Sequence, residues 1–260
     1  MNIILNGEKR TYEGGTTLFE ISKDVAGNYA HPIIVASVNG NLRELTKTAP
    51  DGATVEFLTM ATDAGNKTYV RGLILLFLRA AYTVFGGKSS IDKVRIEHSI
   101  GNGIYGEIDG SVELNEENIQ LVKQEMQRLV AADLPIKKHV INTTEAAERF
   151  HRHHMYDKEK LFGYRRTSKA NVYSLDGFED YFYGYMPSST GILTVFDVFA
   201  YENGFLLLTP DKENPGKLAK FESKDKFFRV LQESNEWAGI MEIETVGAMN
   251  DALVEGRLNE

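Results

Sequence analysis

The stretch Ile33-Ile34-Val35-Ala36-Ser37-Val38-Asn39-Gly40 sets the fold of the N-terminal part of this chain. Its apolar and β-branched residues predict a strand, and the Asn-Gly pair that ends it favours the left-handed backbone of a tight turn. A second such pair, Asn6-Gly7, lies between Ile3-Ile4-Leu5 and the run 8–12, which predicts an N-terminal hairpin. The N-terminal part is therefore expected to be built around a β-sheet.

A helix is expected between these strands. Thr17-Leu18-Phe19-Glu20 is a capping box, in which the Thr hydroxyl and the Glu carboxylate each accept from one free backbone amide at a helix start. Ile21 and Val25 follow at helical spacing. Pro50-Asp51-Gly52 predicts a later turn, before a strand over residues 54–58. The order of hairpin, helix and further strands is that of a ubiquitin-like β-grasp fold.

The run Val38-Asn39-Gly40-Asn41-Leu42, placed after that helix and followed by Asp51-Gly52 and a strand, resembles the TGS domain. This domain takes its name from threonyl-tRNA synthetases, certain GTPases and the stringent-response synthetases. The resemblance covers residues 1–61, and any other ubiquitin-like domain is the alternative. It implies a regulatory or RNA-contacting module rather than an enzyme.

Residues 66–245 are expected to form a larger second domain, reached through a small polar linker at residues 62–66. A helix over residues 69–85 is apolar nearly all round, which predicts deep burial. The elements expected after it are a strand at 93–97, a glycine-rich turn and strand at 99–108, a long helix capped by Asn115, a short helix from Thr143 or Thr144, and an aromatic, strand-rich region after Tyr164. The chain is therefore predicted to be an α+β protein of two domains.

Two stretches of this second domain resemble the second additional domain of threonyl-tRNA synthetase, which edits mischarged tRNA. They are Ile100-Gly101-Asn102-Gly103-Ile104-Tyr105-Gly106-Glu107-Ile108 and Met186-Pro187-Ser188-Ser189-Thr190-Gly191. Together with the first domain, the resemblance reaches over residues 1–210 and implies a mixed α/β editing-like domain. The catalytic groups that it implies are a His-x-x-x-His pair on the first helix and a Cys-x-x-x-His pair before the second stretch.

The positions implied for these groups hold other residue types. The first pair falls on Arg71 and Leu75, and the second pair falls on Tyr181 and Tyr185. None of the four supplies an imidazole or a thiolate, so none can replace the zinc ligands or the general base. The resemblance therefore implies a degenerate domain without catalytic residues and without a metal.

The cleft of that domain is expected to remain and to hold a different ligand. Its turn around Asn102, with cationic and aromatic neighbours, suits a phosphate, a nucleotide or RNA. The candidate ligand-binding residues are Arg71, Arg79, His98, Asn102, Tyr105, Tyr181 and Tyr185.

A degenerate pair of such domains also precedes the kinase domain of bacterial uridine kinase-like proteins, and residues 182–191 and 205–210 resemble that group more than a synthetase. This implies a regulatory region of a nucleoside kinase, whose downstream domain uses ATP and Mg. A helix that begins near Ala248, within residues 246–260, is expected to lead into that domain. The alternative is an RNA-binding or tRNA-editing module related to threonyl-tRNA synthetase.

Three further patterns have simpler interpretations. Residues 86–90, Gly-Gly-Lys-Ser-Ser, lack the first glycine of a phosphate loop and follow a helix, so a helix stop is expected. The histidine-rich segment 151–154 could bind a metal, but its spacing favours a solvated helix end. The basic and aromatic segment 165–185 could stack on single-stranded RNA or fill the core of a sheet.

The composition limits the classes of protein. The chain has 260 residues, no cysteine and a formal net charge of −8. The missing thiols exclude disulfides and cysteine-ligated metals and fit a cytoplasmic protein, while the acidic balance argues against duplex DNA. The longest apolar run, residues 73–78, is far too short to cross a membrane. A small ligand, RNA and self-association remain as options.

Overall fold

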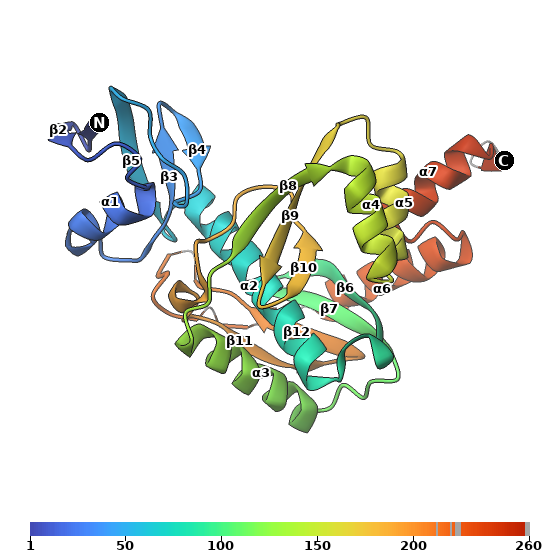
Figure 1. The fold of residues 1–260 in the computed structure, drawn as a ribbon. Helices are drawn as coiled ribbons and strands as arrows, with labels where there is room; N and C mark the ends of the chain where they lie inside the picture. The colour runs from blue at the N-terminus through green and yellow to red at the C-terminus, as the bar shows by residue number, and fades with distance from the viewer. Residues whose placement is uncertain (212, 219, 222–224, 258–260) are drawn as a thin grey trace.

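The computed structural model describes residues 1–211, 213–218, 220–221 and 225–257. Its first part is one sheet with a short helix packed against it (Figure 1). The elements are β1 (Asn2–Leu5), β2 (Glu8–Thr11), α1 (Leu18–Val25), β3 (Ile33–Val38), β4 (Asn41–Arg43) and β5 (Ala53–Thr59). The sheet order is β2-β1-β5-β3-β4, with β1 parallel to β5 and the other pairs antiparallel. The predicted β-grasp domain is confirmed.

Local chemistry accounts for its turns and its helix start. Asn6-Gly7 has φ values of 51° and 87°, and Asn39-Gly40 has values of 51° and 78°, which are the left-handed pairs of tight hairpin turns. The Thr17 hydroxyl accepts from the Glu20 amide at 3.2 Å, and the Glu20 carboxylate accepts from the Thr17 amide at 2.8 Å. Both turns and the capping box are as predicted.

The second part begins with the long helix α2 (Asp63–Val84). Thr62 caps it by accepting from the Gly65 amide at 3.1 Å, and a Cβ at Gly65 would lie 2.0 Å from the Thr59 carbonyl oxygen. The prediction of a linker at residues 62–66 is therefore wrong. The Thr62 cap and the close approach of Gly65 to the Thr59 backbone make this polar segment the first turn of α2, which follows soon after the end of β5.

Two sheets lie on either side of α2 (Figure 1). The larger has the order β11-β12-β7-β6 and consists of β6 (Ile91–Ile100), β7 (Gly103–Gly110), β11 (Asp197–Tyr201) and β12 (Gly204–Leu208). The smaller has the order β10-β9-β8 and consists of β8 (Lys137–Asn142), β9 (Lys169–Leu175) and β10 (Phe178–Tyr181). The helix α3 (Glu116–Ala131) is capped by Asn115, as predicted, and packs beside α2.

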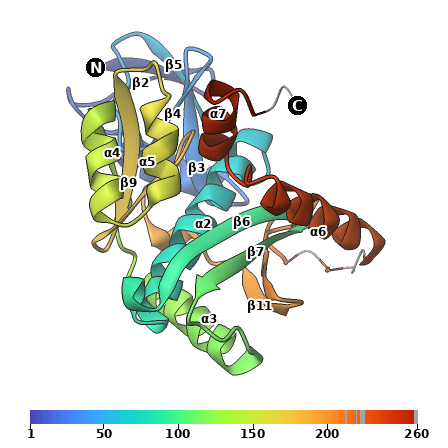
Figure 2. The same cartoon turned by 90° about the vertical axis from the view of Figure 1, so that its right-hand side faces the viewer.

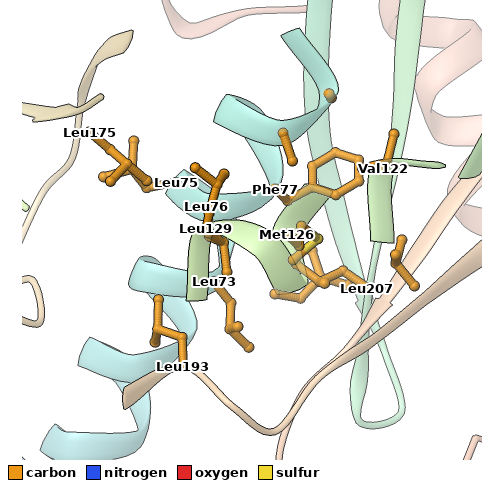
Figure 3. Close-up of a cluster of buried hydrophobic side chains, with 14 of the residues drawn as sticks. Leu73, Leu75, Leu76, Phe77, Val122, Met126, Leu129, Leu175, Leu193 and Leu207 are labelled. Carbon is orange, nitrogen blue, oxygen red and sulfur yellow. The ribbon is translucent and has the colours of Figure 1, made fainter. Parts of the chain in front are cut away.

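The main core forms where α2, α3 and the larger sheet meet. Phe77 of α2 stacks on Phe205 of β12, with ring centroids 4.0 Å apart. Figure 3 shows Leu75 and Leu76 of α2 within the same buried cluster, and Met126 of α3 joins them there. All five side chains have no exposed surface, so the predicted deep burial of α2 is confirmed.

Four further helices complete the fold. The helices α4 (Thr143–Arg152) and α5 (Tyr156–Gly163) pack on the smaller sheet through Phe150 and Phe162. The helix α6 (Asp225–Ile240) was not predicted; it lies along β6 and β7 (Figure 2). The helix α7 (Val246–Val254) contains Ala248, as expected. Among the described helices, none is long and apolar enough to cross a membrane.

The helix expected over residues 246–260 is shorter than predicted. Thr245 caps its start by accepting from the Ala248 amide at 3.1 Å, and it ends at Val254, before Gly256 with a φ of 76°. A glycine in this left-handed conformation is a common way to end a helix. Residues 258–260 lie outside the described residues.

Candidate ligand-binding site

The N-terminal half of α2 packs directly against the run that contains Met186-Pro187. A Cβ at Gly72 would lie 2.5 Å from Pro187 Cγ, so only glycine leaves room for this contact. The neighbouring Arg71 donates from Nη1 to the Tyr185 carbonyl oxygen at 3.3 Å. A Cβ at Gly184 would come within 2.6 Å of the Arg71 guanidinium carbon. Two segments far apart in the sequence therefore meet at Arg71.

The four positions implied by the editing resemblance are divided between this contact and the core. Arg71 and the backbone of Tyr185 lie side by side. Leu75 is fully buried inside the cluster of Figure 3. Tyr181 accepts from Arg165 Nη1 at 2.6 Å through its hydroxyl, beneath the helices α4 and α5. Leu75 and Tyr181 are therefore packing residues.

A pocket of about 350 Å³ opens beside Arg71. One wall is the start of α2 and the other is the turn between β6 and β7; the lining residues are Asn66, Lys67, Val70, Arg71, Ser99, Gly101, Asn102, Gly103, Ile104 and Thr209. The Thr209 hydroxyl donates to the Asn102 carbonyl at 2.8 Å and so ties the turn to the end of β12. The structure thus brings Arg71 and Asn102 together in a pocket of small-molecule size.

Three other predicted residues lie away from this pocket. Arg79 lies about two turns, or about 12 Å, further along α2 than Arg71. There it donates to the Asp176 carboxylate at 2.9 Å. Tyr105 is buried under α6, where its ring meets Phe228 with centroids 4.9 Å apart. His98 Nε2 lies 3.3 Å from Asn235 Nδ2, also on α6.

Strand alternation explains why Tyr105 lies outside the pocket beside Arg71. Successive residues of a strand point to opposite faces of the sheet. Ile104 faces the pocket and the main core, so its neighbour Tyr105 faces α6 instead. The expectation that Tyr105, His98 and Arg79 share one pocket with Arg71 is therefore not met.

A buried polar cluster that no sequence pattern predicts joins the two domains. Glu44, from the β-grasp domain, is 5% exposed and accepts from the Tyr173 hydroxyl at 2.5 Å. The Met186 amide at 3.3 Å and the Lys138 ammonium at 3.4 Å approach the same oxygen. Burial and this carboxylate raise the pKa of Tyr173 above its ordinary value, which keeps the phenol protonated as a donor. We call these four residues the Glu44 cluster.

The other motifs lie outside the pocket beside Arg71, among the residues that the structure describes. Gly86 has a φ of 78° and ends α2, which confirms the helix stop. His151 Nδ1 lies 2.9 Å from Glu159, and no group of three histidine or acidic residues is arranged for a metal in the described part of the chain. The Arg165 guanidinium lies over the Tyr181 ring at 5.0 Å, whereas Arg166 is exposed.

No protein-family model matches this chain. It is similar to threonine–tRNA ligases. That of Thermotoga maritima is 26% identical over 237 residues, which cover 88% of this chain and 36% of the ligase. That of Desulforamulus reducens is 24% identical over 189 residues, covering 72% and 29%, and that of Parabacteroides distasonis is 26% identical over 188 residues, covering 72% and 28%.

These similarities agree with the fold. They extend over both domains and support an α+β architecture in which a TGS-like β-grasp domain precedes an editing-like domain. The chain spans about a third of the length of the curated relatives that it matches. The relatives that the comparisons name are threonine–tRNA ligases, and the similarity covers about a third of their length.

Proposed function

We propose that this chain is a non-catalytic, RNA-binding module related to threonine–tRNA ligases. The observation that carries the proposal is the chemistry of the cleft walls. The helix α2 contains no histidine between Asp63 and Val84, and the whole chain contains no cysteine. No shift of the alignment along this helix therefore restores an imidazole or a thiolate.

The rest of the cleft agrees with binding rather than hydrolysis. None of the six histidines lines the pocket beside Arg71, among the residues that the structure describes. Activation of water for ester hydrolysis needs a metal or a general base, and this pocket offers a guanidinium, an ammonium and neutral amides. Its cations instead suit an anionic ligand.

RNA is the ligand that the comparisons favour. The relatives are named as ligases that act on tRNA. On this chain, Tyr183 is 82% exposed, and Arg166 and Lys169 are exposed near the end of the smaller sheet. Exposed aromatic rings with nearby cations can stack on unpaired bases and neutralise phosphates.

We expect residues 1–260 to bind threonine tRNA with an affinity that falls as salt rises, because bound cations release counterions from RNA. Neutralising two phosphates gives a loss of roughly tenfold between about 50 and about 200 mM salt. Fluorescence anisotropy of end-labelled tRNA measures this, with a DNA duplex of equal length as the control. Equal affinity for both nucleic acids, or no binding at the lower salt, contradicts the proposal.

A second proposal is a regulatory role in a nucleoside kinase, which would supply ATP and Mg chemistry from another domain. It rests on the likeness of residues 182–191 and 205–210 to uridine kinase-like proteins. The named relatives are threonine–tRNA ligases, so the comparisons favour the first proposal.

The encoding gene tests this second proposal. We expect it to encode Gly-x-x-x-x-Gly-Lys-Ser/Thr within about 50 residues after Glu260 if the chain serves a kinase, because that loop holds the transferred phosphates. Sequencing through that region decides the matter: a stop codon or a different domain there contradicts the kinase role.

A further inference from the structure

We infer that the pocket beside Arg71 binds a phosphate monoester, carried either by a free nucleotide or by the end of an RNA strand. The inference names a ligand class for the site described above. It rests on the proposed function only in treating the cleft as a site that binds without hydrolysis.

The charge of the pocket is the first reason. Lys67 and Arg71 line it, and none of its described lining residues is acidic. The local charge balance is therefore opposite to that of the whole chain, which has 37 acidic and 29 basic residues. Within the described part of the chain, Lys67 has one charged partner, Asp63, at 3.4 Å. Both side chains are largely exposed, so water screens that pair and leaves the ammonium accessible.

Unused hydrogen-bond donors are the second reason. Asn66 lines the pocket, and its Nδ2 is shielded from solvent without a hydrogen-bond partner among the described residues. A buried donor left unpaired costs free energy that a ligand oxygen would recover. Arg71 uses Nη1 for the Tyr185 carbonyl, which leaves other guanidinium N–H groups for a planar, two-pronged contact with phosphate.

Arg71 is also held in place before any ligand arrives. Its guanidinium lies against the Gly184 backbone and donates to Tyr185. The Tyr173 hydroxyl of the Glu44 cluster lies 2.8 Å from the Gly184 carbonyl oxygen, so Arg71 lies beside that cluster as well as in the pocket. A side chain fixed in this way loses little conformational entropy when it binds an anion.

A second hollow provides space for the rest of the ligand. It has a volume of about 720 Å³ and shares Gly101 and Asn102 with the pocket beside Arg71. Its charges are mixed, since Lys217 and Lys220 are accompanied by Asp211 and Glu213. A neutral nucleoside or a sugar fits this mixed surface, while the phosphate fits the acid-free pocket.

Titration of residues 1–260 with inorganic phosphate, adenosine monophosphate and adenosine, followed by amide NMR, tests the inference. We expect phosphate and the monophosphate to shift the amides of Asn66 and of residues 101–103, and adenosine to bind at least about tenfold more weakly than its monophosphate, since a charge-assisted contact is lost. Binding of all three with equal affinity, or shifts elsewhere only, would overturn the inference.

Variants on α2 show whether phosphate binding depends on the pocket residues or only on the positive charge of the helix. Arg71→Leu and Asn66→Ala should each weaken phosphate binding, Arg71→Leu by about tenfold, whereas Arg79→Gln removes a cation from the same helix and should change nothing. Unaltered binding by folded Arg71→Leu and Asn66→Ala, judged from their spectra, contradicts the site. Equal loss in Arg79→Gln does so as well.

Measurements with RNA identify the source of the phosphate. They also test the phosphate-site inference separately from the RNA-binding proposal. A short RNA with a 5′-phosphate that binds more tightly than its 5′-hydroxyl form assigns the pocket to an RNA end, and equal binding of the two forms assigns it to a free nucleotide. Salt-sensitive binding of threonine tRNA by Arg71→Leu, with phosphate binding lost, supports both proposals independently. If the unmodified chain binds phosphate but does not bind threonine tRNA, only the RNA-binding proposal is contradicted.

Discussion

Gly72→Val is expected to lower the free energy of unfolding by about 3 kcal/mol. The valine Cβ would lie 2.5 Å from Pro187 Cγ and 3.1 Å from Leu193 Cδ2. The proline ring cannot swing aside, because it is closed onto its own backbone. Glycine is otherwise unfavourable inside a helix by about 1 kcal/mol, so its presence in α2 is explained by this contact.

Gly163→Ala is the matched control, because Gly163 also lies in a helix but has nothing within 4 Å of a Cβ. It should be neutral or slightly stabilising, while Gly72→Ala should be destabilising by about 1 kcal/mol, the clash outweighing the gain in helix propensity. Urea unfolding followed by circular dichroism measures all three. A Gly72→Ala protein more stable than the parent would show that α2 and the Pro187 run do not meet as described.

Glu44→Leu is expected to lower the free energy of unfolding by about 3 kcal/mol, since it removes the buried carboxylate that three partners share. The Met186 amide loses its acceptor, and Lys138, with a side chain 18% exposed, loses its counter-charge. The Tyr173 hydroxyl loses the carboxylate and keeps only the Gly184 carbonyl oxygen at 2.8 Å. The same unfolding measurement checks this. Glu56→Leu, at an exposed position on β5 of the same domain, is the control and should have little effect.

A double-mutant cycle isolates the contact between the domains. Glu44→Leu combined with Tyr173→Phe should be less destabilising than the sum of the single changes, by about 1 kcal/mol or more, because both remove the same hydrogen bond. Additive effects would show that Glu44 and Tyr173 do not interact in solution.

The β-grasp domain could be predicted from the sequence because local signals specify its elements. The Asn-Gly pairs at residues 6–7 and 39–40 require left-handed backbone, and the capping box at residues 17–20 fixes the start of α1. These signals act within a few residues, so they hold whatever the rest of the chain does. The same is true of Gly86, which ends α2, and of Asn115, which begins α3.

The candidate site could be predicted only in part. Arg71 and Asn102 line one pocket, but Tyr105 does not, because the face to which a strand residue points depends on the register of the sheet. Asn66 and Lys67 also line the pocket, but the small polar residues around them predict a linker rather than the start of a helix. Glu44 carries no local signal, since its partners come from three distant parts of the chain.

We propose that this chain keeps the cleft of a tRNA-editing domain without its hydrolytic groups. Incubation of residues 1–260 with mischarged threonine tRNA, above the concentration that binds half of the tRNA, tests this proposal. We predict that the tRNA is bound while its aminoacyl ester decays at the rate seen without protein. Ester hydrolysis that accelerates in proportion to the protein concentration would contradict the claim.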